Sequence, residues 1–381
     1  MKRFFTKQNL LRAVSYILVA ALASAATWFI APRTNKLENL ATIIENRFIG
    51  EVDETYMEDA AAAAMVASLG DMWSSYIPAS VYGAHVENQN NEYVGIGISI
   101  LERDDGQGVE IVDVTAGGPA EEAGLLPGDI ITQVDGQSVM GADTTTLQNL
   151  ILGEKNTRVT IIVLRGEESM EFTVTRKGIH TKVSAGIMLN EEVGYVVIAN
   201  FYNQAGEDTI EVIEDLLSQG AEALVFDVRN NPGGYIDEML EILDYLLPEG
   251  DLLHSVDNNG WKDVDRSDAG CLELPMAVLI NGQSYSCAEI FAAVLHEYDW
   301  ALTVGEPTIG KSYYQNTIEL GDGSAVLLSV GAFTTPKDVN LTEAGGLVPD
   351  VPVEPGEEAV IEWSDDLQLR AAVEALIQEN Q

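Results

Sequence analysis

The spacing of apolar and polar residues changes several times along the chain, and each change marks a segment with a different predicted structure. Residues 13–31 are uncharged and mostly apolar. A membrane-spanning helix needs roughly 17–25 such residues, so this stretch predicts a transmembrane helix. Residues 36–82 place apolar side chains at helical spacing and are rich in strong helix formers up to Gly70, so this segment is predicted to be helical.

Two further patterns occupy the rest of the chain. Between about residues 93 and 177, short β-type runs alternate with turns, which predicts a compact β-rich module. From about residue 183 onward, strands alternate with longer helices, which predicts an α/β core. The strands are expected at 193–199, 223–228, 277–280 and near 325–330, and the helices at 206–219, 235–247, 288–296 and 367–378.

These patterns predict a multidomain α+β protein in four parts. Residues 1–33 would form a cytoplasmic stub and transmembrane anchor, and residues 34–90 a helical segment. Residues 91–178 would form the β-rich module, and residues 179–381 the α/β core. A length of 381 residues suits two or three folded domains.

The charge of the chain is strongly asymmetric. It carries 20 Lys and Arg residues against 61 Asp and Glu residues, a net charge of −41. A chain this acidic repels phosphate backbones, so nucleic acid is not expected as a partner. The first 33 residues instead contain five basic residues and no acidic one. This positive flank predicts a single-pass protein of the cell membrane, with everything after about residue 33 outside the cytoplasm.

A cleaved signal peptide is the alternative for the N-terminal segment. Ala23, Ser24 and Ala25 resemble a small-residue cleavage site. The apolar stretch is long for a signal peptide, however, and Trp28 and Phe29 suit a membrane interface. We therefore expect an uncleaved anchor.

The chain has two cysteines, Cys271 and Cys287, which could form one disulfide in an oxidising compartment. Cys287 lies inside the serine-rich segment at 279–291, whose candidate chemistry favours two free thiols instead. The four histidines are scattered and form no cluster with cysteine, so neither a metal site nor a cofactor is expected.

Two glycine-containing stretches mark the β-rich module. In YVGIGI at 93–98, the glycines free successive backbone N–H groups to converge on an anion such as a peptide carboxylate. The second stretch runs from TAGGPAEEAGLLPGDII at 115–131 to VDG at 134–136. Together they resemble the PDZ domains of bacterial proteases, in which the strand after the loop accepts an extended peptide. The peptide-binding residues implied are Tyr93, Val94, Gly95, Ile96, Gly97 and Ile98. Leu126 departs from the resemblance, because a basic residue is common there, which puts any regulatory role of such a cation in question.

The segment LINGQSYSCAEIF at 279–291 places a serine-rich turn between a buried strand and a helix. A serine at such a junction presents its hydroxyl at a helix N-terminus, where unpaired N–H groups and the helix dipole favour developing negative charge. Ser284 or Ser286 could equally be an ordinary N-cap of the following helix.

The segment TIGKSYYQ at 308–315 places Lys311 in a glycine-flanked turn. Lysine is a poor base near its solution pKa of about 10.4, but burial can lower that pKa enough for the neutral amine to accept a serine proton. GEPTIGKS at 305–312 also matches a phosphate-binding loop formally. We do not favour that interpretation, because residues 312–320 are aromatic and β-prone where the motif requires a helix.

From about residue 36 to its end, the chain resembles the carboxy-terminal processing peptidases, also called tail-specific proteases. The order of helical segment, PDZ domain and protease core is the same. The resemblance implies a crotonase/ClpP-like α/β serine protease core with Ser286 as nucleophile, Lys311 as base and Gln315 orienting the lysine. Tyr285 and Cys287 depart from it, because small residues are usual at both positions.

A further match is FDVRNNPGG at 226–234, which resembles a strand-to-turn segment of the same family. The alternative is that this segment is a simple Asn-Pro-Gly turn with no catalytic role. The resemblance implies that the amide of Gly233 or Gly234 joins the amide of Cys287 in an oxyanion hole. Asp227 and Arg229 are expected to be structural.

Three alternatives remain to be weighed. A Ser-His-Asp hydrolase is disfavoured, because His296 lies ten residues after Ser286 on the same predicted helix. A cysteine protease based on Cys287 would need a histidine partner that we cannot place. A catalytically inactive PDZ scaffold would not need Ser286, Lys311 and Gln315 together. We therefore expect a serine endopeptidase that binds the C-terminal tails of protein substrates, and the resemblance implies that it can form homo-oligomers.

Overall fold

The computed structural model describes residues 35–103, 105–356 and 362–379. The predicted anchor, residues 1–33, lies outside these ranges. Within them, we find no helix with the length and apolar character needed to cross a membrane. The chain divides into two compact units, one ending at Leu69 and the other beginning at Gly70.

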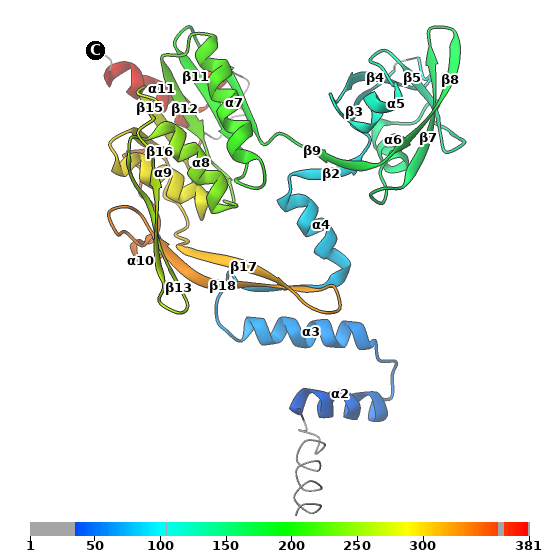
Figure 1. Cartoon of the computed structure of the whole chain (residues 1–381), viewed down its shortest axis with the longest axis horizontal. Coiled ribbons are helices and arrows are strands. Elements are labelled where there is room, and N and C mark those ends of the chain that lie inside the picture. The colour runs from blue at the N-terminus through cyan, green and yellow to red at the C-terminus, as the bar shows by residue number, and fades with distance from the viewer. Residues whose placement is uncertain (1–34, 104, 357–361, 380–381) are drawn as a thin grey trace, which may run out of the picture. The chain divides into compact units, whose positions relative to one another are not determined.

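The described part of the first unit consists of two helices, α2 (Lys36–Arg47) and α3 (Glu54–Ala67) (Figure 1). Each begins after a side chain that satisfies a free N–H group of the first turn. Asn35 accepts a hydrogen bond from the amide of Leu37, and Asp53 accepts one from the amide of Tyr56. Such caps stabilise a helix by about 1 kcal/mol each. The prediction of helix therefore holds for both segments.

The β-rich module lies in the second unit and has a six-stranded antiparallel sheet in the order β3-β4-β5-β7-β8, with β6 paired to β5. Two helices pack on this sheet, around a core that includes the fully buried side chains of Ile111, Leu125 and Ile161. The elements are β3 (Ile98–Glu102), β4 (Val109–Val114), α5 (Pro119–Ala123), β5 (Ile130–Val134), β6 (Gln137–Ser138), α6 (Thr144–Ile151), β7 (Arg158–Arg165) and β8 (Glu168–Thr175).

A two-stranded ribbon connects this module to the rest of the second unit. It pairs β2 (Glu92–Gly95), which follows helix α4 (Ala79–Gln89), with β9 (Lys177–His180). The chain therefore enters and leaves the module along adjacent strands, so the module is an insertion within the sequence of the second unit.

The α/β core is built on a six-stranded sheet in the order β10-β11-β12-β15-β16-β19, in which all strands except β10 run parallel. The strands are β10 (Ser184–Met188), β11 (Val193–Ile198), β12 (Ala223–Asp227), β15 (Met276–Ile280), β16 (Ala301–Gly305) and β19 (Val351–Pro352). Every residue of β12 and β15 is buried, as their continuous apolar sequences require of strands covered on both faces.

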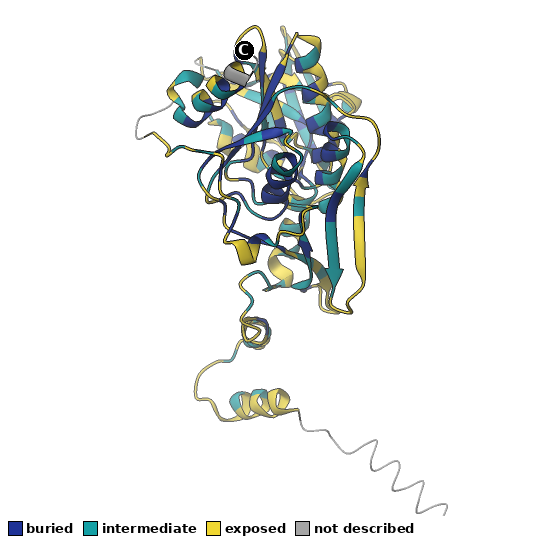
Figure 2. Cartoon of the chain, turned by 90° about the vertical axis from the view of Figure 1, so that its left-hand side faces the viewer, coloured by how far each residue is buried: buried dark blue, intermediate teal, exposed yellow. Residues whose placement is uncertain are grey.

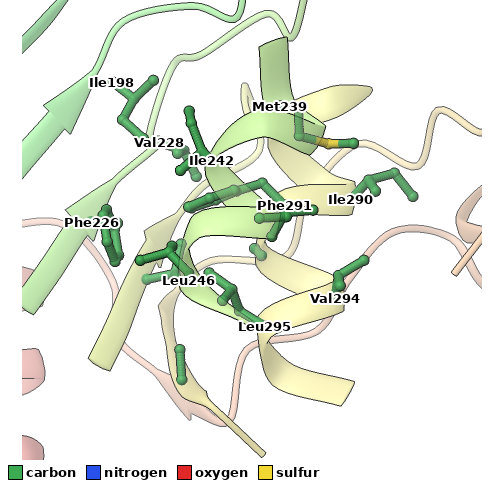
Figure 3. Close-up of a cluster of buried hydrophobic side chains, with 14 of the residues drawn as sticks. Ile198, Phe226, Val228, Met239, Ile242, Leu246, Ile290, Phe291, Val294 and Leu295 are labelled. Carbon is green, nitrogen blue, oxygen red and sulfur yellow. The ribbon is translucent and has the colours of Figure 1, made fainter. Parts of the chain in front are cut away.

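Alternate residues of these strands pack against helices on opposite faces of the sheet. Phe226 and its neighbours on one face contact α7 (Ala205–Ser218), α8 (Ile236–Leu246) and α9 (Cys287–Glu297), as Figure 3 shows for the last two helices. Val225 on the other face packs with α11 (Leu367–Glu379). Burying one such large apolar side chain contributes roughly 1.5–3 kcal/mol. The many apolar side chains that α9 buries against the sheet therefore fix its position. Figure 2 shows the concentration of buried residues in this core.

A second sheet in the order β1-β18-β13-β14, with β17 paired to β18, flanks the core. It comprises β1 (Ser75–Ile77), β13 (Gly250–Asp257), β14 (Lys262–Ser267), β17 (Tyr313–Glu319) and β18 (Ala325–Thr334). The prediction of helix over 36–82 is wrong at residues 75–77, which form β1. These residues pair with residues 325–327, and such a distant partner leaves no periodic signal in a three-residue strand.

Candidate active site

Ser286 lies at the N-terminus of α9, in the turn that follows β15. Its backbone has φ 59° and ψ −123°, a conformation that side-chain-bearing residues seldom adopt. Such strain costs on the order of 1–3 kcal/mol and persists only where the surroundings hold it. The side chain is 8% exposed. Ser284, by contrast, is fully buried and donates to the carbonyl of Val228 at 2.7 Å, which makes it a structural residue.

The surroundings that hold Ser286 centre on Glu289, a fully buried carboxylate on the first turn of α9. Its Oε2 accepts hydrogen bonds from the amides of Ser286 (3.0 Å) and Lys311 (2.8 Å). Its Oε1 accepts from the amide of Gly310 (2.6 Å) and the hydroxyl of Thr308 (2.5 Å). One side chain therefore joins the serine turn to the lysine loop. We did not predict this role, although the S-x-x-E spacing of a capping box at 286–289 was the signal for it.

Lys311 is almost completely buried, at 8% exposed. Its amine donates to Oε1 of Gln315 at 2.6 Å. Burial lowers the pKa of Lys311 below its ordinary value and outweighs the opposing influence of Cys287, Asp71 and Glu289. A neutral amine is therefore easier to form here than in water.

Two aromatic rings lie over the Lys311 amine. The ring centroid of Trp73 is 4.8 Å from Nζ and that of Tyr285 is 5.8 Å away. The backbone carbonyl of Trp73 also accepts a hydrogen bond from the side-chain amide of Gln315. No sequence pattern assigns a role to Trp73, because nothing in the sequence links it to Gln315, 242 residues later.

A groove of about 890 Å³ brings Ser286, Lys311 and Gln315 together. Gly234 also lines it. Much of the remaining wall is aromatic, from Trp73, Tyr82, Tyr202, Tyr235, Tyr285, Tyr313, Tyr314 and Phe333. Such a groove has the size and apolar walls needed to hold side chains of an extended peptide.

The two candidate oxyanion glycines differ in their surroundings. The amide of Gly233 donates to Oδ1 of Asn231 at 2.8 Å, so this N–H group is already engaged. A Cβ atom on Gly233 would lie 2.8 Å from Cβ of Ser286 and 3.0 Å from the amide nitrogen of Cys287. Only glycine therefore leaves the space in front of the Cys287 amide open. A Cβ atom on Gly234 would lie 2.2 Å from the backbone of Phe201.

The thiols do not support a cysteine nucleophile. Cys271 is exposed and Cys287 is buried, and both are free, as the sequence predicted. The Cys287 thiol donates to the carbonyl of Gly234 at 3.4 Å, and burial raises its pKa to about 11. Nδ1 of His296 is 3.0 Å from the carboxylate of Asp350, so this histidine is paired elsewhere.

Two other sequence motifs have structural roles. The phosphate-loop match ends in Ser312, which is fully buried, accepts a hydrogen bond from the amide of Leu341 (2.8 Å) and is followed by strand β17 in place of the required helix. Arg229 donates to Asp227 and to Asp366, and so ties β12 to the segment before α11.

The predicted peptide-binding residues of the β-rich module occupy two strands and the loop between them. Tyr93, Val94 and Gly95 pair with β9, whereas Ile98 begins β3, a terminal strand of its sheet. In the intervening loop Ile96 is buried and its carbonyl accepts from the amide of Ala120 at 2.9 Å. Gly97 has φ 74° in the same loop, a conformation that favours glycine.

Two protein-family models match segments of this chain. The model of peptidase family S41 matches residues 192–353, and a PDZ-domain model matches residues 110–165. A carboxyl-terminal-processing protease from Synechocystis is 30% identical over 336 residues, which cover 85% of this chain and 77% of that protein. A probable CtpA-like serine protease from Staphylococcus aureus is 28% identical over 345 residues, which cover 90% and 69%. The solved structure of a photosystem II D1 C-terminal processing protease is 27% identical and covers 81% of this chain and 84% of its own, with a TM-score of 0.48.

A PDZ domain joined to an α/β peptidase core defines the class of PDZ-containing serine-type proteases. Within that class, the chain belongs to peptidase family S41, the carboxyl-terminal-processing peptidases. The predicted family, its PDZ and protease domains and its enzymatic nature are thereby confirmed. The alternative of an inactive PDZ scaffold is not favoured.

Proposed function

We propose that the protein cleaves peptide bonds with a Ser286–Lys311 dyad in which Gln315 orients the lysine. The observation that carries this proposal is the Glu289 carboxylate, which binds the backbone of Ser286 and of Lys311 at once. A structural serine and an unrelated lysine would not need this shared support. The lowered pKa of Lys311 supports the role of base, since only the neutral amine can take a proton.

In the proposed reaction, Lys311 Nζ accepts the proton of Ser286 as Oγ attacks the carbonyl carbon of the scissile bond. The resulting oxyanion is stabilised by the amides of Cys287 and Gly234. We choose Gly234 because the amide of Gly233 already donates to Asn231. The protonated Lys311 then gives its proton to the leaving amine, and water hydrolyses the acyl-enzyme with the same lysine as base.

We further propose that the PDZ domain selects substrates by their C-terminal tails. The loop at Gly97 would receive the carboxylate, and the tail would add to the free edge of β3 beside α6. The sequence of residues 1–33 supports an uncleaved membrane anchor, with proteolysis outside the cytoplasm. Unfolded or processed proteins of that compartment would then be the substrates.

The experiment that tests the proposed function is cleavage of an unfolded model protein with an apolar C-terminus by the full chain in detergent. Wild type, Ser286→Ala and Lys311→Ala are compared, and the same substrate with an amidated C-terminus tests the tail requirement. We expect cleavage by the wild type alone, and slower cleavage of the amidated substrate. Equal cleavage by all three proteins would refute the dyad.

A further inference from the structure

We propose that Trp73 and Tyr285 are positioning residues for the Lys311 base, which they cover with two stacked rings in the groove that Lys311 shares with Ser286. This inference rests on the dyad proposed above and adds to it two residues outside the dyad. It also gives the segment before the PDZ domain a part in catalysis.

The two rings form one continuous cover. Their centroids are 5.9 Å apart and their planes are inclined by 28°, a stacked arrangement. The Lys311 amine lies 4.8 Å from the Trp73 centroid and 5.8 Å from that of Tyr285, within the range of direct contact between an amine and an aromatic face. Both residues line the groove and are partly buried. The amine is thus enclosed by rings from two distant segments.

Trp73 also acts through its backbone. An amide side chain such as that of Gln315 can be turned either way, with its oxygen or its nitrogen toward the lysine. The carbonyl of Trp73 accepts from Nε2 of Gln315, and this contact requires the nitrogen on the Trp73 side. Oε1 therefore faces Lys311 and accepts its hydrogen bond at 2.6 Å. The position of Trp73 determines the orientation of the residue that holds the base.

The segment around Trp73 is firmly attached to the core. Asp71 accepts hydrogen bonds from the amide of Trp73 (3.0 Å) and the hydroxyl of Ser74 (2.5 Å). The Ser74 hydroxyl in turn accepts from the amide of Ser329 in β18 (3.0 Å). The next residues form β1, which pairs with β18. The indole is therefore held in place and is not a loose surface side chain.

The rings affect the protonation of the amine in two opposite ways. They exclude water, which favours the neutral amine, and their faces attract the ammonium form. The charged or titratable groups around the amine are Asp71 before β1 and Cys287 and Glu289 on α9, all of which favour the ammonium form. Burial nevertheless lowers the pKa of Lys311 and is the largest influence on it. Loss of the indole should therefore raise this pKa and shift activity to higher pH.

The test measures the rate at which a fluorophosphonate phosphonylates the full chain, from about pH 6 to pH 10, a range that brackets a lowered lysine pKa. Each unit of upward pKa shift removes about 90% of the neutral amine at neutral pH, so Trp73→Ala should react roughly tenfold more slowly there and recover at high pH. Trp73→Phe should keep most of the wild-type profile. Trp261→Ala, the same change at a residue that is 74% exposed, is the matched control and should leave the profile unchanged.

Tyr285→Ala provides a second test with the same expected direction and a smaller shift, because its ring is farther from the amine. It decides the question if thermal unfolding shows that Trp73→Ala does not fold. A wild-type pH profile in Trp73→Ala would overturn the inference. If Trp73→Ala does not fold, a wild-type pH profile in Tyr285→Ala would overturn it. The same measurements test the Ser286–Lys311 dyad independently. The dyad is refuted if Ser286→Ala is labelled like the wild type or if Lys311→Ala keeps the wild-type pH profile.

Discussion

The side chain that organises this active site is Glu289, a carboxylate with no exposed surface that touches neither substrate carbonyl nor base amine in the proposed reaction. Its two oxygens accept four hydrogen bonds, three of them from backbone amides. A buried carboxylate is stable only when such donors replace its lost hydration. The strained backbone of Ser286 is therefore maintained by a residue three positions along the chain.

We predict that Glu289→Gln destabilises the protein and slows Ser286 acylation. The glutamine amide would turn an N–H group toward donors that need an acceptor, which costs about 2–4 kcal/mol for a buried site. Denaturant unfolding measures the loss, and fluorophosphonate labelling measures the acylation rate. Glu374→Gln, an exposed change on α11, is the control. A free energy of unfolding and a labelling rate that both equal those of the wild type would mean that the four hydrogen bonds of Glu289 stabilise neither the fold nor the site.

The pH dependence of cleavage follows from the burial of Lys311. Because the proposed base must be neutral, kcat/KM should rise as pH rises through the pKa of Lys311, which burial places below its ordinary value. Activity should be lost on the acid side of that value. Lys311→Arg keeps its proton at all these pH values and should remain inactive throughout. A wild-type profile with no rise on the alkaline side would contradict lysine as the base.

Residues of this site differ in how far the sequence could reveal them. Ser286, Lys311 and Gln315 were proposed from short motifs, because each motif lies within one stretch of chain. Trp73 could not be proposed in this way, since its role depends on a contact with Gln315, 242 residues later. The choice between Gly233 and Gly234 also needed the structure, because it depends on the hydrogen bond that the Gly233 amide donates to the side chain of Asn231.

Charged side chains as well as apolar contacts hold helix α11 against strand β12. Arg229 follows β12 and donates to Asp366 at 2.8 Å and 3.1 Å. Burial alone would raise the pKa of Asp366, but the Arg229 guanidinium and the amides of Leu369 and Gln368 outweigh it and hold that pKa below its ordinary value. The pair therefore stabilises the docking of α11 while Asp366 is ionised.

We predict that Asp366→Asn lowers the free energy of unfolding by about 1–3 kcal/mol at neutral pH. Because the folded pKa is lowered, the contribution of Asp366 is present above its unfolded pKa and is lost as pH falls through the folded value. The difference between wild type and variant should therefore narrow in acid. Urea unfolding at a series of pH values measures it, with exposed Asp113→Asn as control. A difference that stays constant with pH would argue against this linkage.

The elements of the α/β core were predictable because their signals are local. Continuous apolar runs marked β12 and β15, and amphipathic stretches marked α7 and α8, with ends that differ from the structure by at most one residue. Strands β13 and β14 gave no clear signal, because their residues alternate poorly and are only partly buried. The pairing of β13 with β18 and of β14 with β13 comes from tertiary structure and not from local preference.

The second unit is interrupted in sequence by its PDZ domain. Strand β1 and Trp73 precede the PDZ domain in sequence, yet they complete the sheet and the groove of the protease core. The S41 match begins only at residue 192 and so does not include them. The functional protease core is therefore larger than the matched segment.

We predict that a fragment of residues 70–381 is labelled by a fluorophosphonate, and that a fragment of residues 78–381 is labelled at least about tenfold more slowly. The shorter fragment lacks β1 and the Trp73 ring over Lys311 but keeps every residue of the proposed dyad. Thermal unfolding of both fragments separates loss of folding from loss of the base. Equal labelling rates would show that the N-terminal strand is dispensable for acylation.

The pairing of β1 with β18 also has a consequence for the time at which the enzyme becomes active during its synthesis. The two strands are separated by roughly 250 residues, so β1 cannot pair until the chain has been synthesised as far as β18. The lysine loop and its cover are assembled from the same late contacts. The groove of a nascent chain would thus stay incomplete until β18 has been made, and proteolysis would begin only after β1 has paired with it.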